Sequence, residues 1–333
     1  PTFNTQPQDI QICEGATISA LTVSYINGVG IPTYQWYSNT VNSITGATII
    51  IGATNPTYTP QTTTAGTTYY YCTITLSGGG CPQIESNLAE IIVYPDPTIN
   101  LNPTVSQMIC VGGTIANPLQ VGYTNGIGIP TYQWYSNTTN SNTGGTIIPG
   151  ANSNLYTPPT FSSTGNYYYY CEISLNGNGC DNVTSAAGEI QVFNDPIVTD
   201  PITTQQLCVN TTPTDLQVSA SGGMPGATFT YQWYSNTASS NTGGTIITGE
   251  TNPTYTPNTT SSGTIYYYCI IQQNNGNTGC ETISNTAEVI VTPGPTFNTQ
   301  PQDIQICEGA TISALTVSYI NGVGIPTYQW YSN

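Results

Sequence analysis

The sequence contains no lysine, no arginine and no histidine, while 16 aspartates and glutamates give its 333 residues a net charge of -16. Every side chain that is ionised at neutral pH is therefore an anion. Nucleic-acid binding depends largely on Lys and Arg that neutralise phosphates, and anionic membrane surfaces attract the same cations. We therefore expect neither nucleic acid nor an anionic membrane surface as a partner.

The missing cations also restrict catalysis, because acid–base, nucleophilic and oxyanion chemistry commonly draws on His, Lys or Arg. A hydrolase with a pair of carboxylates is the one common class that remains. The acids do not look paired, since Glu90, Glu189 and Glu288 recur at a single repeat position and most others are scattered through turns. We predict no enzyme, no catalytic residues and no cofactor.

Long apolar runs are absent as well. None approaches the ~20 residues that cross a bilayer, so no membrane insertion is expected in this window. The start shows no basic region followed by an apolar one, so an export signal is expected outside a window cut from a longer protein. Metal ligation is not predicted, because histidine and C-x-x-C pairs are missing; Asp96 and Asp195 lie at two linkers, but Gly294 lies at the third.

Internal repetition dominates what is present. The segment TYQWYSN occurs four times, with its tryptophan at Trp36, Trp134, Trp233 and Trp330, a period of about 98 residues. Pro97, Pro196 and Pro295 lie in the short linkers between copies. We predict repeats at 1–96, 97–195 and 196–294 and a partial repeat at 295–333, which copies residues 1–39 letter for letter.

Short Thr-, Tyr-, Val- and Ile-rich runs, separated by Gly, Pro and Asn, predict antiparallel strands in a sandwich. In repeat 1 we expect strands near 9–13, 18–25, 33–38, 48–51, 57–59, 67–76 and 88–94. Alternation then predicts an inward-facing core and an outward Glu90. The expected core residues are Leu21, Val23, Tyr34, Trp36, Tyr58, Tyr70, Cys72, Ile74, Ala89, Ile91 and Val93, with Trp134, Tyr169 and Cys171 in repeat 2 and Trp233, Tyr267 and Cys269 in repeat 3.

A tryptophan in the third long strand and the Tyr70-x-Cys72 pattern in a later one resemble the core of immunoglobulin domains. Val23 stands where the partner cysteine of such a domain would fall, which puts the usual inter-sheet disulfide in doubt. The C-x-G opening, the YQW strand and the late Gly-Cys further resemble repeat modules of Bacteroidota cell-surface adhesins of the SprB gliding-motility type. That resemblance implies an all-β array of immunoglobulin-like domains that forms an elongated rod on the bacterial surface.

Three cysteines per repeat cannot all pair within their repeat. Cys72 is expected to be a buried thiol. Because the turn after the first cysteine and the loop with the last lie at opposite ends of such a domain, we hypothesise bonds between neighbouring repeats, Cys13 to Cys180 and Cys110 to Cys280. The alternatives join Cys13 to Cys72 or to Cys81. The remaining candidates are Cys208 and Cys307, and so many cysteines fit an oxidising exterior.

Three tyrosines, Tyr37, Tyr69 and Tyr71, are expected to face outward, where stacking between strands or binding of a sugar would explain them. The preferred interpretation is a structural stalk of a giant secreted adhesin, which works through length, stiffness and resistance to trypsin-like proteases. The alternatives are glycan- or cell-binding modules and a subunit of a self-assembling filament. The expected partners are neighbouring repeats and, for the first alternative, a glycan or cell surface.

Overall fold

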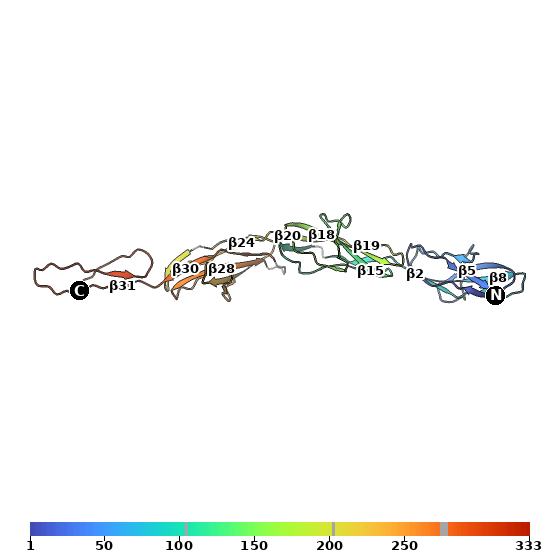
Figure 1. The fold of residues 1–333 in the computed structure, drawn as a ribbon, viewed down its shortest axis with the longest axis horizontal. Coiled ribbons are helices and arrows are strands. Elements are labelled where there is room, and N and C mark those ends of the chain that lie inside the picture. Colours follow the sequence, from blue (N-terminus) through green and yellow to red (C-terminus); the bar gives the residue numbers. More distant parts are fainter. Residues whose placement is uncertain (104–105, 202–203, 274–278) are drawn as a thin grey trace. The chain divides into compact units, whose positions relative to one another are not determined.

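The computed structural model describes residues 1–103, 106–201, 204–273 and 279–333, and every regular element in these ranges is a β-strand (Figure 1). The described residues contain no helix with the length and apolar character of a bilayer span. The chain divides into two compact units. Unit 1 comprises residues 1–107, 117–158 and 166–190, and unit 2 comprises 108–116, 159–165 and 191–333.

Repeat 1 is a two-layer sandwich. Its larger sheet has the order β2-β10-β8-β5-β6, with β9 added beside β8, and its second layer consists of the pairs β1-β4 and β3-β7. The strands are β1 (Thr2–Thr5), β2 (Ile10–Cys13), β3 (Leu21–Thr22), β4 (Ser24–Ile26), β5 (Ile31–Asn39), β6 (Thr48–Ile49), β7 (Thr57–Tyr58), β8 (Gly66–Ser77), β9 (Ile84–Glu85) and β10 (Ala89–Tyr94).

One strand prediction needed correction, and one strand was not predicted. The strand expected at 18–25 is divided, because Val23 donates its backbone N–H to Pro56 O (2.9 Å) while β3 pairs with β7 and β4 with β1. The strand expected at 9–13 is present as β2, which runs parallel to β10, whereas β1, which lies before Pro7 and pairs with β4, was not predicted. The parallel register places Cys13 beside Tyr94, at the end of the sandwich.

Repeats 2 and 3 place strands at equivalent positions. In repeat 3 the larger sheet has the order β22-β30-β28-β25-β26. The strands of repeat 2 are β11 (Thr98–Leu101), β12 (Ser106–Cys110), β13 (Leu119–Gln120), β14 (Gly122–Thr124), β15 (Ile129–Asn137), β16 (Thr146–Ile147), β17 (Leu155–Tyr156), β18 (Gly165–Asn176), β19 (Val183–Thr184) and β20 (Gly188–Phe193). Those of repeat 3 are β21 (Pro196–Thr199), β22 (Thr204–Cys208), β23 (Leu216–Gln217), β24 (Ser219–Gly222), β25 (Phe229–Asn236), β26 (Thr245–Ile246), β27 (Thr254–Tyr255), β28 (Gly263–Gln273), β29 (Glu281–Ile283) and β30 (Ala287–Thr292).

Each complete repeat buries one tryptophan beside one cysteine. Trp36 is directly opposite Cys72 in the β5-β8 register and is fully buried. Its indole N–H donates to Asn55 O at 3.0 Å, and Trp134 and Trp233 make the same bond to Ser153 O and Asn252 O. Burying an indole normally requires a partner for its N–H, and this bond provides it. The other predicted core residues are buried too, except Tyr34 and Tyr58, which are half-buried against the core.

The partial repeat shows what the same sequence does without the second half of a sandwich. Of the strands that residues 1–39 form, only two have counterparts in 295–333: β31 (Thr296–Thr299) and β32 (Ser318–Ile320), which pair with each other. Trp330 is 49% exposed, whereas Trp36, in the same local sequence, is fully buried. The long strand with the tryptophan therefore depends on the strands that pair with it in the sheet, which are β6 and β8 in repeat 1.

Candidate functional site: the disulfide joint between repeats

The contact between repeats 1 and 2, called the joint from here on, begins at the turn that follows β2. After Cys13, Glu14 N–H donates to Tyr94 O and Gly15 N–H donates to Thr62 O, both at 2.9 Å. Gly15 has φ +75°, in the left-handed region where glycine is favoured. The short C-x-G opening therefore reverses the chain and holds Cys13 at the end of its sandwich.

The other side of the joint is the loop after β18 in repeat 2. Its Asn178 O accepts a 2.9 Å hydrogen bond from the Cys13 N–H, which ties the two repeats together through the backbone. Gly179 approaches Ala16 so closely that a Cβ added to it would lie 2.4 Å from the Ala16 Cβ. A side chain at Gly179 would therefore push the loop away from the turn.

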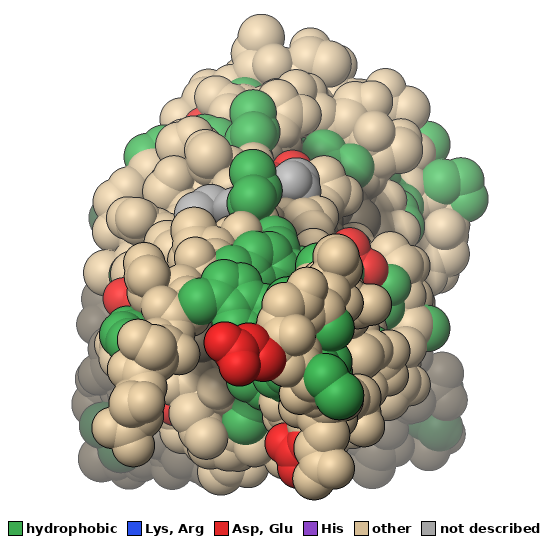
Figure 2. Space-filling view, turned by 90° about the vertical axis from the view of Figure 1, so that its left-hand side faces the viewer, with side chains coloured by type: hydrophobic (Ala, Val, Ile, Leu, Met, Phe, Trp, Pro, Cys, Tyr) green, Lys and Arg blue, Asp and Glu red, His purple; other side chains and the backbone are tan. Residues whose placement is uncertain are grey.

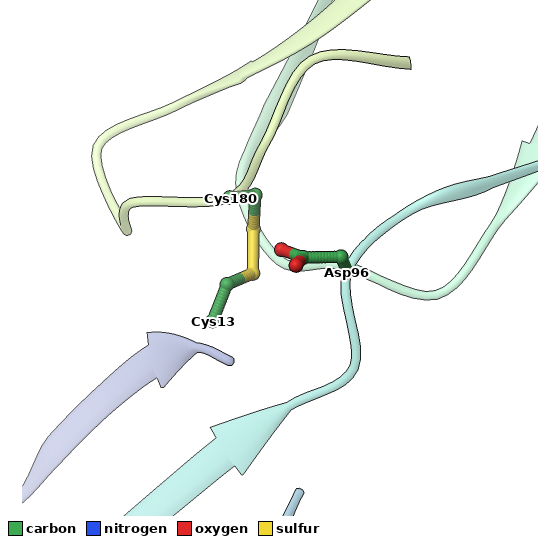
Figure 3. A group of neighbouring side chains, drawn as sticks. All are labelled: Cys13, Asp96 and Cys180. Carbon is green, nitrogen blue, oxygen red and sulfur yellow. A yellow bond between two sulfur atoms is a disulfide. The ribbon is translucent and has the colours of Figure 1, made fainter. Parts of the chain in front are cut away.

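A disulfide between Cys13 and Cys180 closes this joint, with Cα atoms 4.8 Å apart (Figure 3). Cys13 is fully buried and Cys180 is half-buried. Both residues belong to unit 1. The bond joins the first repeat to the second, as the hypothesis of bonds between neighbours requires, and the structure shows neither alternative pairing of Cys13 within its own repeat.

The second joint repeats this arrangement inside unit 2. Cys110 and Cys280 form a disulfide with Cα atoms 5.0 Å apart and pack with buried Met224 in one cluster. A Cβ on Gly279 would lie 2.4 Å from the Gly113 Cα, so this loop, too, approaches its turn closely. Sequence reasoning did not anticipate Met224; its position in a Gly-rich loop gave no periodic signal.

The Asp96 carboxylate lies beside the first disulfide, with an oxygen within 4.8 Å of both sulfurs (Figure 3). It also accepts a 3.2 Å hydrogen bond from the backbone N–H of Asp181. Thiolates, not disulfide sulfurs, are the strong metal ligands, so the bonded pair leaves a single carboxylate there. At the second linker, burial raises the pKa of Asp195.

The six other cysteines have free thiols. Cys72, Cys171 and Cys269 lie buried beside the tryptophans, and burial raises the pKa values of these thiols to about 11, 12 and 11. Cys81 and Cys208 are half-exposed and Cys307 is exposed, so these three disulfide candidates have no disulfide partner in the structure.

The outward tyrosines are largely occupied within the chain. Tyr71 was expected on the surface, but it is 6% exposed, and its ring stacks on Tyr37 with centroids 4.9 Å apart. In the later repeats a glycine just before β16 or β26 donates its N–H to the equivalent hydroxyl, Gly145 to Tyr170 and Gly244 to Tyr268.

Tyr69 is half-buried and donates its hydroxyl to Glu90 at 2.6 Å, and the pairs Tyr168–Glu189 and Tyr266–Glu288 repeat this bond. The hydrogen bond to Glu90 is the main cause of the raised pKa of Tyr69. The recurring glutamate, expected to be simply solvated, is therefore the acceptor of a cross-strand bond.

These sandwiches, with a central tryptophan and tandem order, define the chain as an array of immunoglobulin-like β-sandwich domains. The family described as a domain of unknown function, DUF8696, matches residues 2–95, 102–194 and 201–293. Because these stretches cover most of the sequence, the chain belongs to this family.

Among solved structures, the chain is similar to the I-band fragment I67–I69 from titin, at 12% identity and a TM-score of 0.38, covering 87% of this chain and 96% of that one. It is also similar to Sidekick-1 immunoglobulin domains 1–4, at 20% identity and a TM-score of 0.30, covering 90% and 76%. The insect immune protein hemolin matches at 15% identity and a TM-score of 0.32, covering 91% and 79%. No curated protein matches the sequence.

Proposed function

We propose that this chain is a load-bearing section of the stalk of an extracellular bacterial adhesin, and that it is not an enzyme. The observation that carries the proposal is the overlap of the two disulfides. The first spans residues 13–180 and the second spans 110–280, so the second bond begins, and the first bond ends, inside repeat 2.

The overlap changes how the chain can be stretched. Between the bonded pairs the backbone forms three parallel segments, 13–110, 110–180 and 180–280, and the shortest of them limits the extension. At ~3.3–3.6 Å per extended residue, 70 residues span about 240 Å, whereas the 267 residues from 13 to 280 would span about 920 Å. When the repeats unfold, the bonds therefore prevent about three quarters of the extension that the unbonded chain would allow.

Further features support a location outside the cell and a spacer role. Disulfides form and persist in oxidising compartments. Lys and Arg, which trypsin-like proteases require, are absent. In its most specific form, we propose a gliding-motility adhesin, because the repeat motifs resemble those of SprB-type adhesins. Glycan binding through Tyr69 and Tyr71 has less support, because both side chains have intramolecular partners.

Stretching single chains by their termini tests the proposal. Under oxidising conditions we expect the segment from residue 13 to 280 to lengthen to about 240 Å, and after reduction to about 920 Å. The variant Cys13→Ser/Cys110→Ser should extend fully without reductant. The control Cys81→Ser/Cys307→Ser keeps both bonds and should behave as the parent. Full extension of the oxidised parent would contradict a load-bearing role.

A further inference from the structure

The turn after Cys208 is built like the two turns that carry disulfides. Val209 N–H donates to Thr292 O and Asn210 N–H donates to Thr259 O, both at 2.9 Å. The equivalent bonds follow Cys13 and Cys110 at 2.8–2.9 Å. Asn210, at φ +63°, takes the left-handed conformation of Gly15 and Gly112. This third turn is thus folded as a joint, although its cysteine is unbonded.

Cys208 differs from its counterparts in what covers it. Cys13 and Cys110 are fully buried and bonded to a cysteine of the next repeat, whereas Cys208 is half-exposed. It lines a cavity of about 730 Å³ together with residues of the partial repeat, among them Val317 and Trp330. All of these residues belong to unit 2.

The partial repeat already makes one contact of a finished joint. Gly322 N–H donates to Pro293 O at 3.0 Å, just as Gly126 N–H donates to Pro95 O at 2.8 Å in the first joint. Figure 2, which views the left-hand side of Figure 1, shows hydrophobic side chains gathered at the centre of the surface drawn there. Phe297, Tyr328 and Trp330 are 61%, 55% and 49% exposed.

Repeat 1 shows what covers such a face. Residues 295–333 are identical to 1–39, and in repeat 1 the strands β10 and β8 from residues 40–96 lie between β2 and β5 in the sheet and complete the core, with Trp36 opposite Cys72. A segment with the sequence of residues 40–96 therefore fits the open face. The loop after its β8 would carry the residue represented in repeat 1 by Cys81, which has a free thiol.

We infer that Cys208 is one half of a third inter-repeat disulfide, and that the other half is the Cys81-type cysteine of a repeat-1 segment seated on residues 295–333. When a copy of residues 40–96 is joined directly after Asn333, its cysteine lies 167 residues after Cys208, which is the separation of Cys13 and Cys180. The third bond would overlap the second as the second overlaps the first. Formation of this bond does not require the chain to be part of a stalk.

Bond formation here is an ordinary oxidation. Two thiols, those of Cys208 and of the incoming cysteine, lose two protons and two electrons as their sulfurs join. A small-molecule disulfide such as oxidised glutathione accepts them and leaves as two thiols.

The test uses the full chain lengthened by a second copy of residues 40–96 after Asn333, folded with oxidised and reduced glutathione. Peptic peptides analysed by mass spectrometry at low pH should join Cys208 to the added Cys81. Alkylation of Cys208 should fall at least tenfold relative to the original chain. Quenching of Trp330 by iodide should fall as well, which reports separately that the repeat has been completed.

Two matched variants of the lengthened chain complete the design. Cys→Ser at the added Cys81 should restore alkylation of Cys208 while Trp330 stays protected, whereas Cys307→Ser should change neither. A protected Trp330 with a free Cys208, or with Cys208 bonded to Cys307, would overturn the disulfide. An exposed Trp330 would show that the added segment does not pack on residues 295–333, and would overturn the inference. A Cys208–Cys81 bond between two unlengthened chains would assign the occupant to a second copy instead, and so overturn the inference as stated.

Discussion

At the scale of single residues, a buried serine supports the central cysteine of each repeat. Ser86 Oγ accepts the backbone N–H of Cys72 at 2.9 Å, and Ser185 and Ser284 do the same for Cys171 and Cys269 at 3.0 Å. Ser185 and Ser284 are fully buried. Each serine directly follows the short strand β9, β19 or β29. Its hydroxyl therefore accepts the backbone N–H that the carbonyl of a paired strand would otherwise accept.

Removing this hydroxyl should destabilise its repeat. Ser284→Ala leaves the buried N–H of Cys269 without its acceptor, and we expect the free energy of unfolding of repeat 3 to fall by about 1–3 kcal/mol. Hydrogen exchange of a peptide covering β28, read as a function of urea, measures this locally. The exposed Ser262→Ala should change stability by less than about 0.5 kcal/mol. Equal effects of the two substitutions would contradict the role of Ser284.

The buried thiols predict a loss of stability in alkali. Burial raises the pKa of Cys72 to about 11, while an exposed thiol has a pKa of about 8.5. Between these values the unfolded chain binds fewer protons than the folded chain, so the free energy of unfolding decreases as pH rises. The contribution is complete below about pH 8.5 and is lost as pH passes about 11.

Urea unfolding between pH 8 and 11, with the exposed thiols alkylated beforehand, measures this loss. Several buried tyrosines also have raised pKa values and act in the same direction. The triple variant Cys72→Ala/Cys171→Ala/Cys269→Ala should therefore show a shallower, but not flat, dependence on pH. If parent and variant have the same slope, the thiols do not contribute.

At the scale of elements, the joint depends on a turn, a loop and one linker carboxylate. The Asp96 carboxylate lies within 4.8 Å of both sulfurs of the first disulfide. Reduction of a disulfide begins with attack by an anionic thiolate, which a neighbouring carboxylate repels. A unit charge about 4 Å away contributes roughly 1 kcal/mol in water, which corresponds to about fivefold in rate.

The substitution Asp96→Asn should therefore speed reduction of the Cys13–Cys180 bond by glutathione about fivefold at low salt. Reduction by an uncharged phosphine should change little, because that reagent carries no negative charge. Within the same molecules, the Cys110–Cys280 bond serves as the control and should keep its rate. Equal acceleration by both reagents would indicate a structural opening of the joint rather than loss of repulsion.

Sequence reasoning accounts for the strands and the core because alternation and the tryptophan period are local signals. It failed for Tyr71, since alternation predicts the direction of a side chain but not whether a neighbouring ring, here that of Tyr37, covers it. The position of Asp96 against the disulfide also escaped it, because that proximity depends on how two repeats meet. The exposed Trp330 and the buried Trp36 show that an identical local sequence does not decide burial.

At the scale of the whole molecule, the charge of one sign gives an unusual acid response. Ordinary proteins become strongly cationic below their isoelectric point and regain solubility. This chain has no Lys, Arg or His, so protonation of its 16 carboxylates leaves the amino terminus as the one cationic group of the sequence. Carboxylates are protonated in acid, so electrostatic repulsion between chains should disappear below about pH 4 and not return.

Light scattering at low ionic strength between pH 7 and pH 2 should therefore rise through pH 4 and remain high. The control is a chain with lysine at four exposed threonines, Thr40→Lys, Thr63→Lys, Thr64→Lys and Thr248→Lys. It should scatter most near its isoelectric point and dissolve again at pH 2, because its lysines then carry an unbalanced positive charge. If the parent chain also dissolves again at pH 2, electrostatic repulsion is not what keeps these repeats apart at neutral pH.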